Sequence, residues 1–124
     1  MDNLVLIVED SPTQALGLQA TLKSAGLMAI CATDGFMGLR RADQLRPALI
    51  VLDVEMPGID GFKVCEELKR NPETASIPII IFSRHDRNEV IQLMTKLDGV
   101  DFIPKDAFAI PVLMETIRQI GLLK

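Results

Sequence analysis

Five side chains that can carry charge or donate a hydrogen bond follow short apolar segments of the chain. They are Glu9, Asp10, Asp53, Ser83 and Lys105. Neighbouring carboxylates repel one another, and a hard cation such as Mg²⁺ resolves that conflict because it prefers oxygen ligands. A cation, a lysine and a hydroxyl around one aspartate can bind a phosphoryl group, and the carboxylate can act as the nucleophile. Each residue alone is common in a turn, so the inference depends on their joint placement.

The segments that precede these side chains predict a parallel β-sheet. They are continuously apolar and cover residues 4–8, 27–32, 48–52, 77–82 and 100–103. Continuous apolarity is typical of strands that are buried on both faces. Ligands of an open parallel sheet bind outside the carboxyl ends of its strands. We therefore expect the five side chains to meet at one edge of the sheet.

Helices are expected between the strands, because helix start signals recur there. The predicted starts are Ser11, Asp34, Asp60, the pair Asp86 and Glu89 as a capping box, and Pro111. In the second helix, Phe36 and Leu39 are expected to face the core. Alternation of five strands with five helices predicts an α/β fold with helices on both faces of the sheet.

Composition excludes several classes of protein. Thirteen basic and seventeen acidic residues among 124 give a net charge of −4, which excludes a strongly basic nucleic-acid footprint. No apolar run approaches the length of a membrane span. Cys31 and Cys65 form neither a disulfide framework nor a zinc pattern, so we expect a cytoplasmic protein. We expect one domain over residues 1–124.

In these residues the chain resembles a receiver domain of a two-component response regulator, of the superfamily that includes the chemotaxis regulators. The resemblance rests on Glu9, Asp10, Asp53, the run Met56-Pro57-Gly58-Ile59-Asp60-Gly61, Ser83, Phe102 and Lys105. It covers essentially the whole chain. It implies a flavodoxin-like (βα)5 fold, a three-layer sandwich whose five parallel strands lie in the order 2-1-3-4-5.

The resemblance also implies a role for each residue of the site. Asp53 would be the phosphoacceptor, and Lys105 would hold a phosphoryl oxygen. Asp10 would ligate Mg²⁺ (or Mn²⁺) directly, and Glu9 would help through water. Asp53 and the backbone carbonyl of Glu55 would complete the metal ligands of the protein.

The same resemblance implies a switch and its partners. Ser83 would move toward the phosphoryl group and Phe102 would turn inward, which would remodel the fourth helix, fifth strand and fifth helix as an output surface. Glu55 and His85 would tune dephosphorylation through water access. A sensor histidine kinase or a histidine phosphotransfer domain would donate the phosphoryl group, and the downstream protein target is unknown. The domain would catalyse only its own phosphorylation and dephosphorylation, with no membrane or nucleic-acid contact, as a monomer or a weak phosphorylation-linked dimer.

One departure from the family pattern keeps an alternative open. Asp106 follows Lys105 where the family usually has proline, and we expect Asp106 to pair with Lys105 and weaken its hold on phosphate. A degenerate receiver that acts only as an interaction module therefore remains an alternative. The chain is either a stand-alone regulator or a fragment of a larger protein, and the sequence does not separate the two.

Other functions fit the residues less well. A haloacid-type phosphohydrolase should carry its nucleophile after the first strand, whereas Asp53 follows the third. A flavodoxin needs a Ser/Thr/Gly-rich phosphate loop where Glu9 and Asp10 stand. An EF-hand loop starting at Asp53 would have Pro57 and Val64 at positions that require oxygen ligands.

Overall fold

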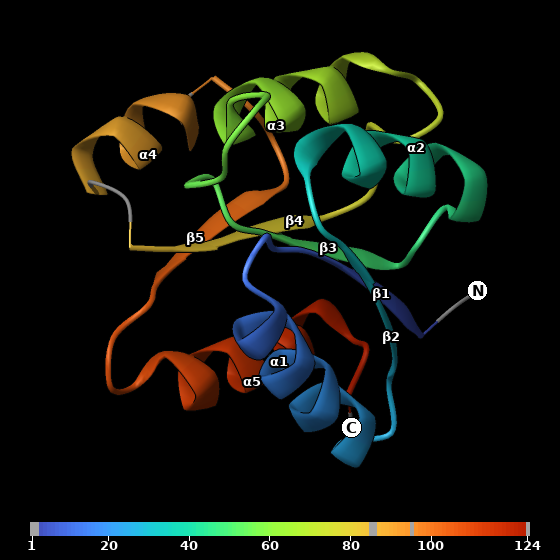
Figure 1. Cartoon of the computed structure of the whole chain (residues 1–124), viewed down its shortest axis with the longest axis vertical. Helices are drawn as coiled ribbons and strands as arrows, with labels where there is room; N and C mark the ends of the chain where they lie inside the picture. The colour runs from blue at the N-terminus through green and yellow to red at the C-terminus, as the bar shows by residue number, and fades with distance from the viewer. Residues whose placement is uncertain (1–2, 85–86, 95, 124) are drawn as a thin grey trace.

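Five parallel strands form one sheet in the order β2-β1-β3-β4-β5, as predicted (Figure 1). The computed structural model describes residues 3–84, 87–94 and 96–123. The strands are β1 (Leu4–Val8), β2 (Met28–Ala32), β3 (Leu49–Leu52), β4 (Ile79–Ser83) and β5 (Val100–Pro104). The helices are α1 (Pro12–Ser24), α2 (Gly35–Leu45), α3 (Gly61–Arg70), α4 (Arg87–Met94) and α5 (Ala109–Ile120).

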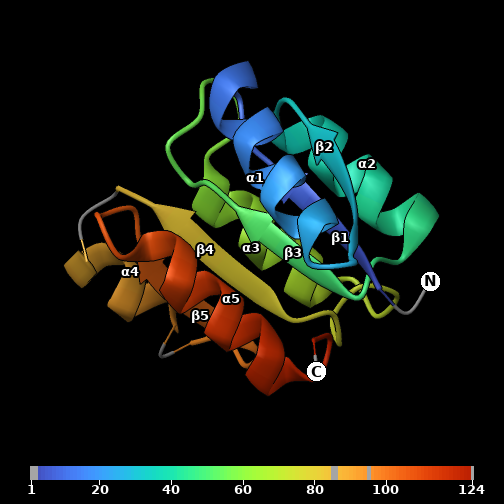
Figure 2. The ribbon, with the colours of Figure 1, turned by 90° about the horizontal axis from the view of Figure 1, so that it is seen from below.

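Helices cover both faces of the sheet and divide the core in two. Helices α1 and α5 lie on one face, and α2, α3 and α4 lie on the other (Figures 1 and 2). On the first face, Leu22 and Leu113 are fully buried beneath α1 and α5, and on the second face Val64 and Val90 are buried beneath α3 and α4. Burial of this apolar surface from both sides explains why the strands are continuously apolar. Among the described residues, no helix combines the length and apolar composition that a membrane crossing needs.

The predicted caps position three of the helices. The side chains of Ser11, Asp34 and Asp60 accept hydrogen bonds from backbone N–H groups in the first turns of α1, α2 and α3. Helix α5 begins at Ala109, so Pro111 is its third residue rather than its start. The capping box at Asp86 lies outside the described residues.

The predicted inward face of α2 is partly wrong. Phe36 is 63% exposed, whereas Leu39 is half-buried. The buried residues of α2 are Gly35, Gly38 and Ala42. A Cβ on Gly38 would lie 2.9 Å from Cγ2 of Val8, so α2 packs closely on β1 through its small residues. Phe36 lies two residues from Gly38, about 200° around the helix, so it faces away from β1.

Candidate functional site

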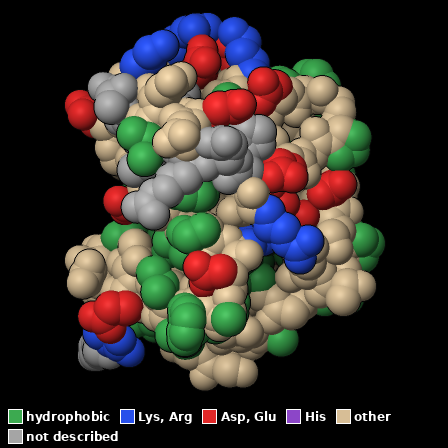
Figure 3. Space-filling model, turned by 90° about the vertical axis from the view of Figure 1, so that its left-hand side faces the viewer, with side chains coloured by type: hydrophobic (Ala, Val, Ile, Leu, Met, Phe, Trp, Pro, Cys, Tyr) green, Lys and Arg blue, Asp and Glu red, His purple; other side chains and the backbone are tan. Residues whose placement is uncertain are grey.

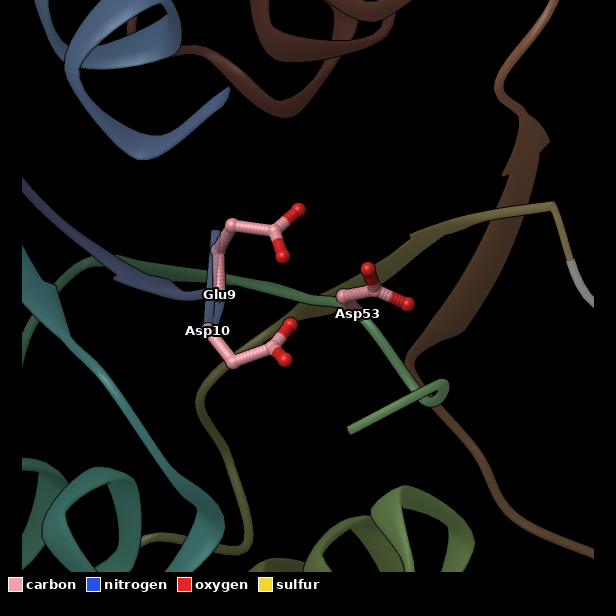
Figure 4. A group of neighbouring side chains, drawn as sticks. All are labelled: Glu9, Asp10 and Asp53. Carbon is pink, nitrogen blue, oxygen red and sulfur yellow. The ribbon is translucent and has the colours of Figure 1, made fainter. Parts of the chain in front are cut away.

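The carboxyl ends of four strands bring the predicted side chains together. Glu9 and Asp10 follow β1, and Asp53 follows β3 (Figure 4). Ser83 is the last residue of β4, and Lys105 follows β5. The backbone fixes these positions. The Asp53 N–H donates to the Val8 carbonyl at 3.0 Å, and the Lys105 N–H donates to the Ser83 carbonyl at 3.0 Å. The sheet ladder therefore continues into the site itself.

Asp53 lies at the centre of the cluster, and its two carboxylate oxygens have different surroundings. Oδ1 accepts from the Ser83 hydroxyl at 2.9 Å and from the Glu55 backbone N–H at 2.8 Å. Oδ2 accepts from the Lys105 ammonium at 3.0 Å. Ser83 is fully buried and Asp53 is 9% exposed. The carboxylate is thus held in one orientation by a hydroxyl, an amide and a cation.

The Lys105 ammonium is bound by three side-chain acceptors. It lies 2.5 Å from Oε1 of Glu9, 2.7 Å from Oε1 of Gln14 and 3.0 Å from Oδ2 of Asp53. It also lies 5.7 Å from the centroid of the Phe82 ring, within the range of a cation–π contact. An ammonium has three N–H donors, so these acceptors match its donor capacity.

The expected pairing between Asp106 and Lys105 is wrong. Oδ1 of Asp106 accepts from the backbone N–H of Phe108 at 2.9 Å, which is a local turn contact. The Lys105 ammonium points instead to Glu9, Gln14 and Asp53. Replacement of the family's usual proline by Asp106 therefore leaves Lys105 in reach of Asp53.

The three acidic side chains form a candidate cation site. One oxygen each from Glu9, Asp10 and Asp53 lies within 4.8 Å of the others (Figure 4). Burial raises the pKa of Glu9, and the Asp53 charge adds to that shift, while hydrogen bonds from Lys105 and from the Ser11 backbone N–H oppose it. A pocket of about 150 Å³ opens over the cluster. Carboxylates that face an open pocket suit a hard divalent cation such as Mg²⁺.

The remaining predicted residues lie around this centre. Glu55 is exposed and lines the pocket. Phe102 is half-buried and packs against the hydrophobic core on the face of the sheet that α3 and α4 cover. His85 lies outside the described residues.

Two further side chains of the site were not predicted from the sequence. Gln14 and Arg84 line the same pocket as Asp53. Arg84 directly follows Ser83, so its place at the strand end was available from the sequence. Gln14 lies in the first turn of α1, where a glutamine is unremarkable, and only the position of Lys105 reveals its contact.

The chain matches the model of the response regulator receiver domain over residues 5–118. It belongs to that family. It is 34% identical over 116 residues to the protein PilH of Pseudomonas aeruginosa, covering 93% of this chain and 91% of PilH.

Solved receivers have the same fold. A signal receiver domain of a histidine kinase from Syntrophus aciditrophicus is 35% identical, with a TM-score of 0.82, covering 95% of this chain and 89% of that one. The chemotaxis protein CheY4 of Vibrio cholerae has a TM-score of 0.86 at 25% identity, covering 97% and 99%. The receiver domain of the sensor kinase PA1611 from Pseudomonas aeruginosa, with a TM-score of 0.82 at 23% identity and coverage of 98% and 99%, was solved with a magnesium ion in its active-site cleft.

Several relatives are longer than this receiver. The chain spans 38% of the transcriptional regulator RpaA of Synechocystis, to which it is 36% identical over 97 residues, covering 78% of this chain. It spans 23% of the response regulator PleD of Caulobacter vibrioides, to which it is 38% identical over 106 residues, covering 85% of this chain. The part that these proteins share with this chain is therefore the receiver.

Proposed function

We propose that this receiver accepts a phosphoryl group on Asp53 from the phosphohistidine of a sensor histidine kinase or a histidine phosphotransfer domain. The observation that carries the proposal is the environment of the Asp53 carboxylate. It contacts the Ser83 hydroxyl and the Lys105 ammonium, and two further carboxylates lie beside it. This arrangement combines a nucleophile with groups that stabilise charge on a transferred phosphoryl group.

The transfer is a displacement at phosphorus. An oxygen of the Asp53 carboxylate forms a bond to phosphorus while the bond from phosphorus to the donor imidazole nitrogen breaks. The electron pair of the broken bond stays on that nitrogen, and Asp53 becomes an acyl phosphate. Lys105 donates to a phosphoryl oxygen as negative charge develops there. The chain contributes mainly position and charge, because phosphoryl transfer needs little covalent chemistry from the protein.

The acidic cluster would hold a divalent cation beside Asp53. The ligands would come from Glu9, Asp10, Asp53 and the backbone carbonyl of Glu55, with Mg²⁺ or Mn²⁺ as the ion. When bound, the ion supplies positive charge that offsets the repulsion between the carboxylates and the phosphoryl oxygens. The magnesium ion in the PA1611 receiver and the oxygen-rich donor set of this chain both support the proposal.

Phosphorylation would be read out on the surface formed by α4, β5 and α5. Ser83 would exchange Oδ1 of Asp53 for a phosphoryl oxygen, and Phe102 would turn inward on the neighbouring strand. Glu55 and His85 would set the rate of hydrolysis through water access. Figure 3 shows hydrophobic side chains gathered on one face, and Phe108, at 73% exposed, is the most exposed large apolar side chain among the described residues. Exposed apolar surface suits a partner-binding role.

The receiver would function as one domain over residues 1–124 in the cytoplasm, as a monomer or a weak phosphorylation-linked dimer. Its output would be contact with a downstream protein target, without membrane or nucleic-acid contact of its own. Its chemistry would be limited to its own phosphorylation and dephosphorylation.

The test is the intact mass of the protein after incubation with acetyl phosphate and Mg²⁺. The expected result is the gain of one phosphoryl mass in the wild type and none in Asp53→Asn, which keeps the size of the side chain. Omission of Mg²⁺ with a chelator should abolish the gain. No gain in the wild type, with acetyl phosphate or with a panel of sensor kinases, would overturn the proposal and favour the interaction module.

A further inference from the structure

Gln14 contacts the Lys105 ammonium from outside the acidic cluster. Its Oε1 lies 2.7 Å from Nζ of Lys105, and the residue belongs to the first turn of α1. It is exposed and lines the pocket that opens over Asp53. The other two partners of the ammonium, Glu9 and Asp53, are buried carboxylates.

The donor capacity of Lys105 creates a competition. Its three N–H groups already match the acceptors of Glu9, Gln14 and Asp53. A phosphoryl oxygen that binds Lys105 while the ammonium stays between the two carboxylates must replace one of these acceptors.

Gln14 is the partner that costs least to release. Hydrogen bonds from an ammonium to carboxylates are stronger than those to a neutral amide. Release of Glu9 or Asp53 would separate a buried carboxylate from the ammonium, whereas the exposed amide of Gln14 can bond to water instead.

We propose that Gln14 is a positioning residue that holds the third N–H of Lys105 and is displaced by the incoming phosphoryl group. Gln14 thereby sets how readily the site accepts a phosphoryl group. This inference rests on the proposed function of Asp53. It assigns to α1 a role in tuning Lys105 that is separate from metal binding.

The test uses side chains of similar size with different acceptor strength at position 14. Gln14→Met removes the amide acceptor, and Gln14→Glu replaces it with a carboxylate. The probe is beryllium fluoride, a stand-in for the phosphoryl group, added with Mg²⁺ and followed by fluorine NMR. We expect Gln14→Met to bind the probe roughly two- to tenfold more tightly than the wild type, the factor that the net loss of one exposed hydrogen bond implies. We expect Gln14→Glu to bind it more weakly.

A matched control separates the contact with Lys105 from net charge. Thr13→Glu adds the same charge on the neighbouring exposed residue and should weaken binding less than Gln14→Glu. With acetyl phosphate, Gln14→Met should lower the half-saturating concentration more than it changes the maximal rate, a split that a purely structural role would not produce. Thermal unfolding checks that each variant folds.

The outcomes distinguish the two proposals. Equal or weaker probe binding by Gln14→Met overturns the role of Gln14 and leaves the phosphorylation of Asp53 standing. A wild type that binds no probe and gains no phosphoryl mass overturns the function proposed for Asp53, and the role of Gln14 with it.

Discussion

A Cβ atom on Gly61 would lie 2.3 Å from the Cα of Val54, the residue that follows Asp53. The start of α3 thus lies directly against the backbone of the loop that follows Asp53. The contact is with main chain, which cannot rotate away as a side chain can. The glycine that ends the run from Met56 to Gly61 is therefore required by packing next to the site.

Gly61→Ala should destabilise the receiver and disturb Asp53. The added methyl forces α3 and the loop apart, and overpacking of this kind costs about 1 to 3 kcal/mol of the free energy of unfolding. Urea denaturation measures the loss, and the rate of phosphorylation by acetyl phosphate should fall with it. Gly17→Ala is the matched control, because a Cβ on Gly17 meets nothing within 4 Å. Gly17→Ala should raise the free energy of unfolding by about 0.5 to 1 kcal/mol, because glycine inside a helix is less favourable than alanine. An unchanged free energy for Gly61→Ala would contradict the packing argument.

Glu9 makes the stability of the metal-free receiver depend on pH. Its pKa is raised above the ordinary value of 4.5, chiefly by burial, so the folded state binds its proton more tightly than the unfolded state. The contribution of Glu9 to the free energy of unfolding should therefore fall as the pH rises from 4.5 through the pKa of the folded state. Glu9→Gln has no such proton, so its free energy of unfolding relative to the wild type should rise across that window and then stay constant toward neutral pH.

Thermal unfolding in a chelator at a series of pH values measures this difference. Asp101→Asn is the control, since Asp101 is exposed on β5 and its removal changes the net charge equally. The control should run parallel to the wild type. A stability difference between Glu9→Gln and the wild type that stays flat from acid to neutral pH would show that the burial of Glu9 does not govern its titration.

Lys105 should oppose metal binding in the resting receiver. Its ammonium contacts Glu9 and Asp53, two of the three carboxylates proposed to hold Mg²⁺. Lys105→Met removes that competing charge, and we expect Mg²⁺ affinity to rise by about three- to tenfold, as a repulsion of about 1 kcal/mol implies. Calorimetric titration with Mg²⁺ measures it. Lys63→Met, which removes an exposed lysine of α3, should leave the affinity nearly unchanged. Weaker Mg²⁺ binding by Lys105→Met would refute the competition.

The fold was predictable because the apolar segments and the helix caps of the sequence indicate the same alternation of strands and helices. The run at residues 4–8 became β1 with the predicted bounds, and Ser11 caps α1 as its position before Pro12 implied. The convergence of Asp53, Ser83 and Lys105 followed from parallel topology, because they lie at the carboxyl ends of the neighbouring strands β3, β4 and β5. Topology alone was enough to bring them to one edge.

Side-chain orientation was less predictable, because it depends on the distance between elements. Phe36 was expected inward from its hydrophobicity, yet Gly38 forms the close contact of α2 with Val8, and Phe36 is exposed. Asp106 was expected to pair with its neighbour Lys105, yet it closes a turn with Phe108, while Lys105 extends to Glu9 and Gln14. Neither outcome follows from residue type or spacing.

The two cysteines should differ sharply in reactivity. Cys65 is fully buried beneath α3, and burial raises the pKa of its thiol to about 11, so only roughly a thousandth of it is thiolate at pH 8. Cys31 is only half-buried on the edge strand β2, although burial also raises its pKa. Iodoacetamide at pH 8 should therefore alkylate Cys31 before Cys65, as peptide mass analysis will show. In Cys31→Ser, the remaining thiol should stay unmodified in the folded protein and react only in denaturant. Alkylation of folded Cys31→Ser at the rate of the denatured protein would mean that α3 opens from the sheet, which the packing of Cys65 against the core argues against.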